Sequence, residues 1–184
     1  PRYAQAQTIS FTDERIKAVV LDLDGLQGGG LAKLQTIGDK IQKVRDAGKK
    51  VIAIGSGYRR DQYYLASRAD EVIMHELGLV YLEGYDYYRM FFRSALEKLQ
   101  VDLNVFRVGE FKSFVEPFIR DDMSAEDREA SQVWLSGLWS AWERDVAAAR
   151  KLKPGALQSY ADDLASRIEA EKGNAARAAV NAGL

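Results

Sequence analysis

The residue of this chain best suited to chemistry is Lys112, because its neighbours can draw it out of water. An apolar run and a glycine turn precede it, and Phe111 and Phe114 flank it. Loss of hydration disfavours the ammonium form, so these rings would lower the lysine pKa from about 10.4 towards the roughly 7–8 that a general base needs. Glu110 and Glu116 oppose that shift if their carboxylates lie close. The pattern alone fits either a general base or a solvated surface lysine.

Two aspartates at the end of an apolar strand form a second candidate. Asp22 and Asp24 stand two residues apart, as do the nucleophile and the acid/base of haloacid-dehalogenase-like phosphohydrolases. Ser56, a lysine and Asp121–Asp122 could supply the remaining parts. Leu26 departs from that family's Thr or Val, and Asp121–Asp122 precedes a helix start, where acids are favoured anyway. Both aspartates also fit a simple turn at a strand end.

Three further features carry weaker chemical signals. Gly28–Gly30 precedes a predicted helix and could present backbone N–H groups to an anion or oxyanion. It lacks the nucleotide-binding spacings, so a flexible turn explains it as well. His75, the single histidine, has no evident partner, which favours a structural or surface role. Aromatic residues around another predicted helix start could form core or a groove for peptide side chains: Tyr85, Tyr87, Tyr88, Phe91 and Phe92.

The composition limits the classes of function. The chain has 184 residues, 47% apolar and 29% charged, which suits one folded domain or one domain with an appendage. Its net charge of −1 gives no field to attract nucleic acid or acidic lipid. With no cysteine and one histidine it offers no disulfide, thiol nucleophile or zinc cluster, and we expect neither metal nor cofactor. No run approaches the roughly 18 apolar residues of a membrane span.

Alternating strands and helices must position these residues. The pattern predicts strands at 17–24, 51–54, 71–74, 79–82 and 103–108, and helices at 31–47, through 63–66 and at 87–99. Gly48 stands where a helix C-cap is expected. This alternation is typical of βαβ units around a largely parallel sheet.

The last third is predicted to be helical. Ser124 followed by Asp127 indicates a capping box, so a helix should begin there. Its apolar face carries three tryptophans, too much surface to leave in water, and should pack on a core or a partner. The residues of that face are Trp134, Leu135, Leu138, Trp139, Trp142 and Val146. Lys153–Gly155 should close this helix, and a second should run from Leu157 through the alanine-rich end.

Three segments together resemble a known family. They are VIAIGSGYRRDQYYLASRADEV (51–72), FRVGEFKSFVEPFIRDDMS (106–124) and REASQVWLSGLW (128–139). They resemble the N-terminal half of the signal peptide peptidase A (protease IV) family, in its long two-domain form. The resemblance implies an α/β, crotonase-like (ClpP/crotonase) superhelix of β-β-α units with a mixed, mostly parallel sheet and C-terminal helices. It also implies a lead-in over 1–16 and one truncated domain over 17–184, the second catalytic half being absent.

The resemblance assigns a role to Lys112. In that family the lysine of the VGxxKS motif is the general base of a Ser–Lys dyad, in a membrane-associated serine endopeptidase that degrades cleaved signal peptides. The serine lies in the C-terminal half, which would be a partner of this chain. Signal peptides or other apolar peptides are the implied substrates, and a homo-oligomer is expected. The implied location is the bacterial cytoplasmic membrane, extracytoplasmic side, through an anchor not in this chain.

This half departs from the family pattern at the nucleophile. Arg59 takes the position that a serine would hold. Ser56 and Ser113 lie elsewhere, and Ser113, covalently next to Lys112, should point away from it. Gly28–Gly30 occupies the region of the oxyanion loop and is expected to be a degenerate copy. The chain is therefore expected to supply a base without its serine and to be inactive alone.

Two alternatives stay open at this stage. The missing serine and the tryptophan-bearing face also suit a non-catalytic scaffold or oligomerisation domain. The more remote alternative is the phosphohydrolase built on Asp22 and Asp24.

Overall fold

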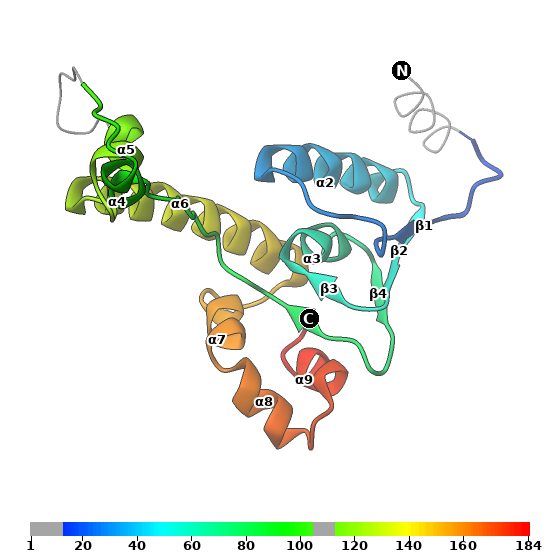
Figure 1. The fold of residues 1–184 in the computed structure, drawn as a ribbon. Helices are drawn as coiled ribbons and strands as arrows, with labels where there is room; N and C mark the ends of the chain where they lie inside the picture. The colour runs from blue at the N-terminus through cyan, green and yellow to red at the C-terminus, as the bar shows by residue number, and fades with distance from the viewer. Residues whose placement is uncertain (1–12, 105–112) are drawn as a thin grey trace. The chain divides into compact units, whose positions relative to one another are not determined.

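The computed structural model describes residues 13–104 and 113–184. The chain forms two compact units, one made of residues 1–84 and 141–184 and the other of residues 85–140 (Figure 1). Each unit is described by itself below.

Parallel strands form the centre of the first unit. β1 (Ala18–Asp22), β2 (Lys50–Gly55) and β4 (Glu71–Met74) make a sheet in the order β1-β2-β4, and both of its ladders are parallel. The short strands β3 (Tyr58–Arg59) and β5 (Val80–Tyr81) pair in parallel as well. Among the described residues every ladder is therefore parallel, and the predicted α/β class is confirmed. Four of the five predicted strands lie where the sequence placed them.

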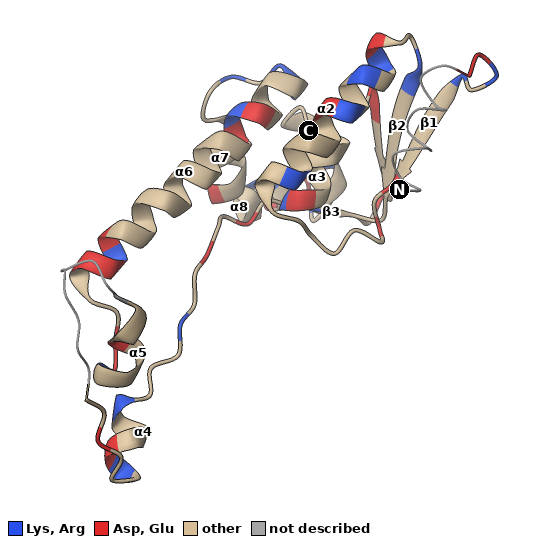
Figure 2. Ribbon diagram, turned by 90° about the horizontal axis from the view of Figure 1, so that it is seen from above, with Lys and Arg blue, Asp and Glu red and all other residues tan. Residues whose placement is uncertain are grey.

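Two helices cover one face of the three-stranded sheet. α2 (Leu31–Asp46) and α3 (Arg60–Ala66) both contact β2, whose Val51 and Ala53 are 1% and 0% exposed. Side chains alternate across a strand, so these two residues share the covered face. Figure 2 shows both signs of charge along α2, as expected for a helix with one solvated side. Gly48, with φ +75°, follows the end of α2 and confirms the predicted C-cap glycine.

The C-terminal helices complete the first unit. α6 (Ala125–Arg150) begins in the second unit and ends in the first; α7 (Ala156–Asp162), α8 (Leu164–Ala170) and α9 (Ala175–Asn181) follow. The single helix predicted after Gly155 is thus wrong, because it is divided into three. Gly173, with φ +89°, adopts a left-handed conformation. Asn174 then caps the start of α9, because its side-chain oxygen accepts the Arg177 N–H at 2.8 Å. A side-chain cap of this kind favours a new helix start over continuation.

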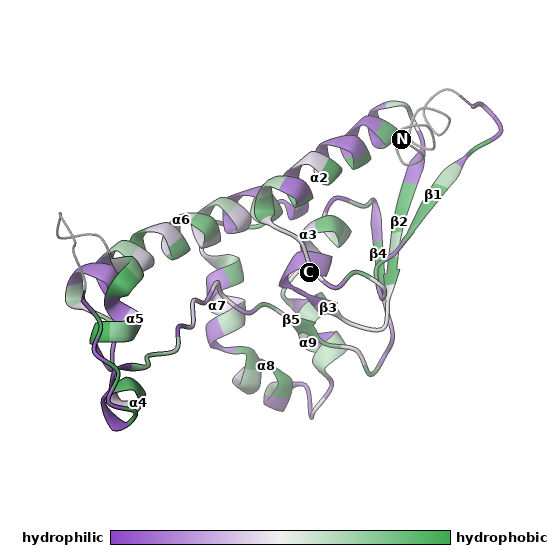
Figure 3. Ribbon diagram, turned by 45° about the horizontal axis from the view of Figure 1, so that its top comes forward, coloured by the Kyte–Doolittle hydropathy of each residue, from purple (hydrophilic) through white to green (hydrophobic). Residues whose placement is uncertain are grey.

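The tryptophan-bearing face of α6 is buried where it lies in the first unit. Trp142 and Val146 are both 0% exposed, and the indole N–H of Trp142 donates to the Arg60 carbonyl at 3.3 Å. Figure 3 shows the alternation of hydrophobic and hydrophilic residues along α6. The predicted packing of this face is confirmed for these two residues. Trp134, in the second unit, keeps 45% of its surface exposed.

A carboxylate joins three helices of the first unit. Asp145 on α6 accepts from the Tyr64 hydroxyl at 2.8 Å and from the Gln35 amide at 3.0 Å. Arg68 in turn donates to the Tyr64 hydroxyl at 2.9 Å. Burial, helped by the bond to Asp145, raises the pKa of Tyr64 to about 12. The phenol is therefore a neutral donor at neutral pH.

The second unit contains short helices around the first part of α6. They are α4 (Arg93–Lys98), the 3₁₀ turn η1 (Ser113–Val115) and α5 (Glu116–Ile119). The prediction of a helix over 87–99 is wrong in its first half, because only 93–98 is helical. The predicted strand at 103–108 does not form at 103–104, and the rest of it lies outside the described residues.

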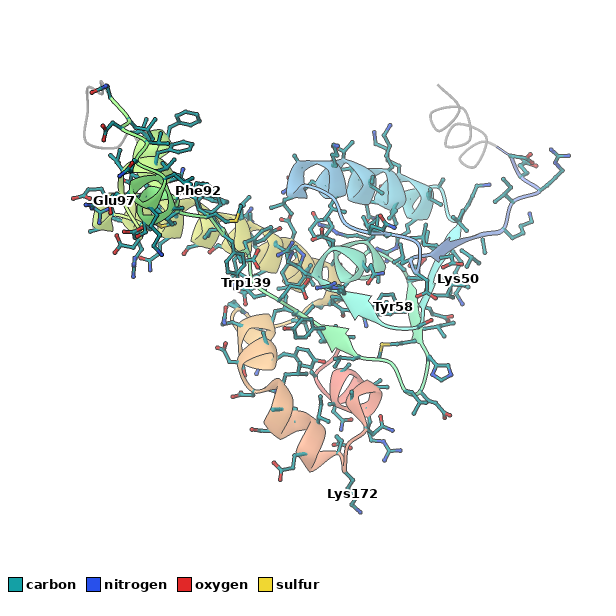
Figure 4. All side chains as sticks on the ribbon, viewed as in Figure 1. Lys50, Tyr58, Phe92, Glu97, Trp139 and Lys172 are labelled. Carbon is teal, nitrogen blue, oxygen red and sulfur yellow. The ribbon has the colours of Figure 1, made fainter. Side chains whose placement is uncertain are left out.

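Tertiary contacts explain why residues 87–92 do not continue the helix. Tyr87 packs edge-on against Trp134 with ring centroids 5.8 Å apart, and Phe92 stacks on Phe118 at 6.1 Å. The Phe92 N–H donates to the Pro117 carbonyl at 2.6 Å, so it is bonded outside any helix (Phe92 is labelled in Figure 4). Contacts with α5 and α6 therefore outweigh the local helix preference.

We expect Trp142→Ala to lower the free energy of unfolding by about 3–5 kcal/mol, since it leaves a large cavity among α3, α6 and their neighbours. Urea titration followed by far-ultraviolet circular dichroism measures the change. Trp134→Ala is the matched control on the same helix, and its half-exposed ring should cost no more than about 1.5 kcal/mol. Equal losses for the two variants would contradict this account of the core.

Candidate functional site

The predicted base lies outside the described residues. Lys112, Phe111 and Glu110 fall in the range 105–112, so their surroundings are not part of the structure described. Phe114, the other flanking ring, is 82% exposed. Of this motif, the structure describes the segment that follows the lysine.

That segment is fixed by a buried carboxylate. Glu116, the first residue of α5, is 2% exposed, and Ser124 is 7% exposed. One oxygen of Glu116 accepts from the Ser124 hydroxyl at 2.5 Å, and the other accepts from the Ser124 backbone N–H at 3.1 Å. The Ser124 hydroxyl in turn accepts the Asp127 N–H at 3.1 Å, as an N-cap does. The predicted N-cap is therefore confirmed. The predicted capping box with Asp127 is wrong in its second bond, because the Ser124 N–H donates to Glu116 and the Asp127 carboxylate pairs with Arg89.

The charge of Glu116 is stabilised in spite of its burial. Burial by itself raises the pKa of this carboxyl, but the two bonds from Ser124, with Arg120 and Arg89 nearby, hold the pKa below its usual range. Arg89 also pairs with Asp127 at 2.9 Å, which ties the segment before α4 to the start of α6. The ionised form of Glu116 is thus the form that the fold selects.

The acidic pair proposed for a phosphohydrolase is used structurally. Asp121 accepts from the backbone N–H of Ser94 at 3.0 Å and from its hydroxyl at 2.7 Å, at the start of α4. Asp122 pairs with Arg120 at 3.0 Å. Both aspartates belong to the second unit, whereas the aspartates at the end of β1 belong to the first.

The end of β1 forms a satisfied turn. Asp24 accepts from the Ser56 N–H at 2.7 Å and from the Ser56 hydroxyl at 2.8 Å, while Asp22 accepts the Asp24 N–H at 3.2 Å. The backbone N–H of Ser56, followed by its hydroxyl, holds the pKa of Asp24 below its usual range. The structure thus brings Asp22, Asp24 and Ser56 together, as the sequence suggested. Within the described residues, however, no three acidic or histidine side chains converge as a metal site would require.

The glycine triplet lies beside the position where the family pattern places a serine. Gly28 adopts φ +130°, and the Gly29 N–H donates to Asp61 at 2.9 Å. Arg59 is the N-cap of α3 and pairs with Glu83 at 3.1 Å. A pocket of about 230 Å³ lies here, lined by Leu26, Gln27, Gly28, Arg59, Arg60, Asp61, Gln62 and Glu83. None of these lining residues is a serine, threonine or cysteine.

The remaining candidates have ordinary roles. His75 is exposed, and its Nδ1 accepts the Leu77 N–H at 3.1 Å within a turn. Of the aromatic group, Tyr87 and Phe92 pack within the second unit, whereas Tyr88 is 87% exposed. The bond between Glu116 and Ser124 was not predicted. The one sign of this bond in the sequence is the short side chain of Asp127, three residues after Ser124. An aspartate there reaches the Ser124 N–H poorly, which leaves that N–H for another acceptor.

We expect Ser56→Ala to raise the pKa of Asp24 part of the way back, because the hydroxyl bond is lost and the backbone bond stays. A depressed carboxyl pKa stabilises the fold above the unfolded value of about 3.9, and this stabilisation is lost as pH falls through the folded pKa. Carboxyl ¹³C titration by NMR of the wild type and the variant measures it. An unchanged Asp24 pKa would mean that the hydroxyl bond contributes nothing.

Comparison of the sequence with known proteins shows a family match. Residues 43–179 match the family described as Peptidase family S49. The chain is 40% identical over 172 residues to Protease 4 of Haemophilus influenzae, covering 94% of this chain and 28% of that protein. It is 38% identical over 169 residues to Protease 4 of Salmonella typhi, covering 92% and 27%. It is 26% identical over 157 residues to the chloroplastic serine protease SPPA of Arabidopsis thaliana, covering 85% and 23%.

The chain therefore spans little more than a quarter of the length of the two Protease 4 relatives that it matches. Of the helices in the part of the chain described, none has both the length and the hydrophobicity to cross a membrane. The match favours a peptidase over the phosphohydrolase alternative, and it confirms the family that the lysine motif and its flanking segments predicted. This chain belongs to peptidase family S49.

Proposed function

We propose that this chain is the N-terminal part of a serine endopeptidase and supplies Lys112 as the general base of a Ser–Lys dyad. The observation that carries the proposal is the identity of 40% with Protease 4 of Haemophilus influenzae across 94% of this chain, the VGxxKS segment included in the family match. The nucleophilic serine would come from the remainder of the protein. A crotonase-like superhelix, with its sheets extended by that remainder, is the fold that this arrangement implies.

The mechanism requires a neutral lysine. Lys112 would take the proton of the serine hydroxyl as the serine oxygen attacks a peptide carbonyl. The protonated lysine would then give this proton to the leaving amine, which leaves an acyl-enzyme. Lys112, neutral again, would take a proton from the water that hydrolyses the ester and would then give this proton to the departing serine oxygen. One residue thus acts first as base and then as acid in each of the two steps, and it needs no third group to fix a tautomer.

The contacts of Ser56 and Arg59 in the first unit support a dyad whose lysine and serine come from two parts of the protein. The Ser56 hydroxyl donates a hydrogen bond to Asp24, whose pKa is held below its usual range, so this serine is bonded to a carboxylate and not to a lysine. Arg59 and Glu83 occupy the corner beside the glycine loop. A serine supplied by the remainder of the protein is the arrangement that we propose for the dyad.

Signal peptides and other apolar peptides are the proposed substrates, and the bacterial cytoplasmic membrane, extracytoplasmic side, is the proposed location. Both rest on the family resemblance. An anchor outside this chain would hold the protein there.

A second candidate function is assembly. The second unit leaves large apolar side chains exposed: Tyr88, Met90, Leu99, Phe114 and Val133, each at least 70% exposed. Contiguous exposed apolar surface marks contact sites in soluble proteins, and we propose that these side chains belong to such a patch. We propose that this surface contacts a second copy of the chain or the remainder of the protein.

We expect Lys112→Ala in the complete protein to abolish hydrolysis of an apolar peptide ester, with a loss in kcat of at least about 10³-fold, because general-base and covalent catalysis both depend on it. Steady-state kinetics measures the loss. Lys98→Ala, at an exposed lysine, is the control and should keep full activity. Full activity of Lys112→Ala would refute the proposed function.

The isolated 184-residue chain should not hydrolyse the ester and should self-associate through its exposed apolar surface. Sedimentation velocity at several concentrations measures the association, and Tyr88→Glu should weaken it by adding a charge to that surface. Ester turnover by the isolated chain that is lost in Ser56→Ala would contradict the first expectation. A monomer at all concentrations would contradict the second.

A further inference from the structure

One face of the three-stranded sheet stays partly open to solvent among the described residues. α2 and α3 cover the face that carries Val51 and Ala53 of β2. Because successive side chains of a strand point to opposite faces, Ile52 and Ile54 belong to the other face. The register of the two ladders adds one residue of β1 and one residue of β4 to the same side. This open face therefore has four aliphatic side chains: Val20, Ile52, Ile54 and Ile73.

The outer strands leave the open face most accessible. Val20 on β1 is 57% exposed and Ile73 on β4 is 51% exposed, whereas the two isoleucines of β2 are half-buried between them. Scattered exposed aliphatic residues are normal on a protein surface. These four are not scattered, because the ladders pair Val20 with Ile52 and Ile54 with Ile73. The open face is therefore one continuous apolar surface across three strands.

The strand sequences are typical of a sheet that is buried on both sides. AVVLD, KVIAIG and EVIM are nearly continuous apolar runs. A sheet with one solvated face alternates apolar and polar residues, whereas an all-parallel sheet with a covering layer on each face has runs of this kind. Figure 3 shows β1 and β2 coloured mainly as hydrophobic. The strands thus provide for two covering layers, and α2 and α3 supply one of them.

Charged groups border the open face at its two ends. Lys50 of β2 pairs with Glu71 of β4 at 2.7 Å, and both side chains are about half exposed. Asp22, the last residue of β1, is exposed at the opposite end. An apolar centre with a polar border is the usual composition of an interface. The matching surface should therefore be apolar at its centre and carry its polar groups at the border.

The length of the relatives indicates what covers this face. This chain makes up 28% and 27% of the two Protease 4 proteins that it matches, so most of each relative lies outside it. A segment of the same polypeptide covers an apolar face without the loss of translational freedom that binding a second copy costs. The proposed function also requires the remainder of the protein to pack against this chain, since it must bring the serine.

We propose that the open face of the sheet is a docking surface for the remainder of the same protein, which supplies the second apolar layer over Val20, Ile52, Ile54 and Ile73. This inference rests on the proposed function, in which the chain is one part of a longer peptidase. It names the surface of the first unit through which the two parts are joined.

The first test is photo-cross-linking in the complete protein. Benzoylphenylalanine in place of Ile73 should give, on irradiation, a product of monomer mass in which the linked peptide lies outside these 184 residues. Denaturing gel electrophoresis gives the mass, and mass spectrometry identifies the peptide. Benzoylphenylalanine in place of Lys43, which is exposed on α2, is the control and should give no specific cross-link.

The second test uses a smaller probe, because the large photo-reactive side chain could itself disturb the packing. This chain has no cysteine, so Val20→Cys and Lys43→Cys each add a single thiol to a cysteine-free form of the complete protein. Maleimide should label Val20→Cys at least about 100-fold more slowly than Lys43→Cys, since a covered thiol reacts only when its cover opens. The ratio should stay the same when the protein is diluted until it is monomeric.

Four results would overturn the inference. Equal labelling rates at the two positions would mean that the face stays open in the complete protein. A cross-link to another residue of these 184 would mean that this chain covers the face itself. A product of dimer mass, or protection that disappears on dilution, would assign the face to a second copy. Full activity of Lys112→Ala would instead refute the proposed dyad, and because neither docking test measures activity, the two failures are distinguishable.

Discussion

The hydrogen bond between Tyr64 and Asp145 is the contact on which the first unit depends most. It joins α3 to the C-terminal part of α6, and Gln35 brings α2 to the same carboxylate. These three helices are far apart in sequence, and apolar packing alone would allow them to slide past one another. A directional bond at 2.8 Å removes that freedom, since a shift of one helical turn would break all the bonds at the carboxylate. Trp142, one turn before Asp145, then fills the space that this arrangement leaves.

The second unit also contains a carboxylate that is bonded to a hydroxyl from another element. Its buried carboxylate is Glu116, and its neutral partner is the hydroxyl of Ser124. In both units an anion is bonded to a hydroxyl from another element, and an arginine stands close by. Such a group is costly to bury and is satisfied only in one geometry. It therefore selects one packing of short helices whose apolar contacts would not determine a unique arrangement.

The parts predictable from sequence were those determined by local pattern. Strands at 17–24 and 71–74, the helix at 31–47 and the glycine after it follow from periodicity and backbone conformation, which are local properties. The prediction of a helix over 87–99 was wrong in its first half, because the hydrogen bond from Phe92 to Pro117 joins residues that are far apart in the sequence. The prediction of one helix after Gly155 was wrong because Asn174 caps the start of another helix. The alanine-rich sequence around Asn174 obscured this signal. The partner of Ser124 could not be predicted, since a bond between Glu116 and an N-cap depends on how α5 packs on α6.

The corner beside Gly28–Gly30 bears on the proposal that this chain supplies a base and no nucleophile. A loop of this kind approaches α3 closely because Gly28 takes a conformation that other residues rarely adopt. Here Asp61 occupies a loop N–H that could otherwise face an oxyanion, and Arg59 pairs with Glu83 where a serine would stand. These contacts bond the Gly29 N–H and the Arg59 guanidinium within the chain. A backbone N–H that is already bonded is not available to stabilise a developing charge, so the Gly29 N–H contributes to the fold of the first unit.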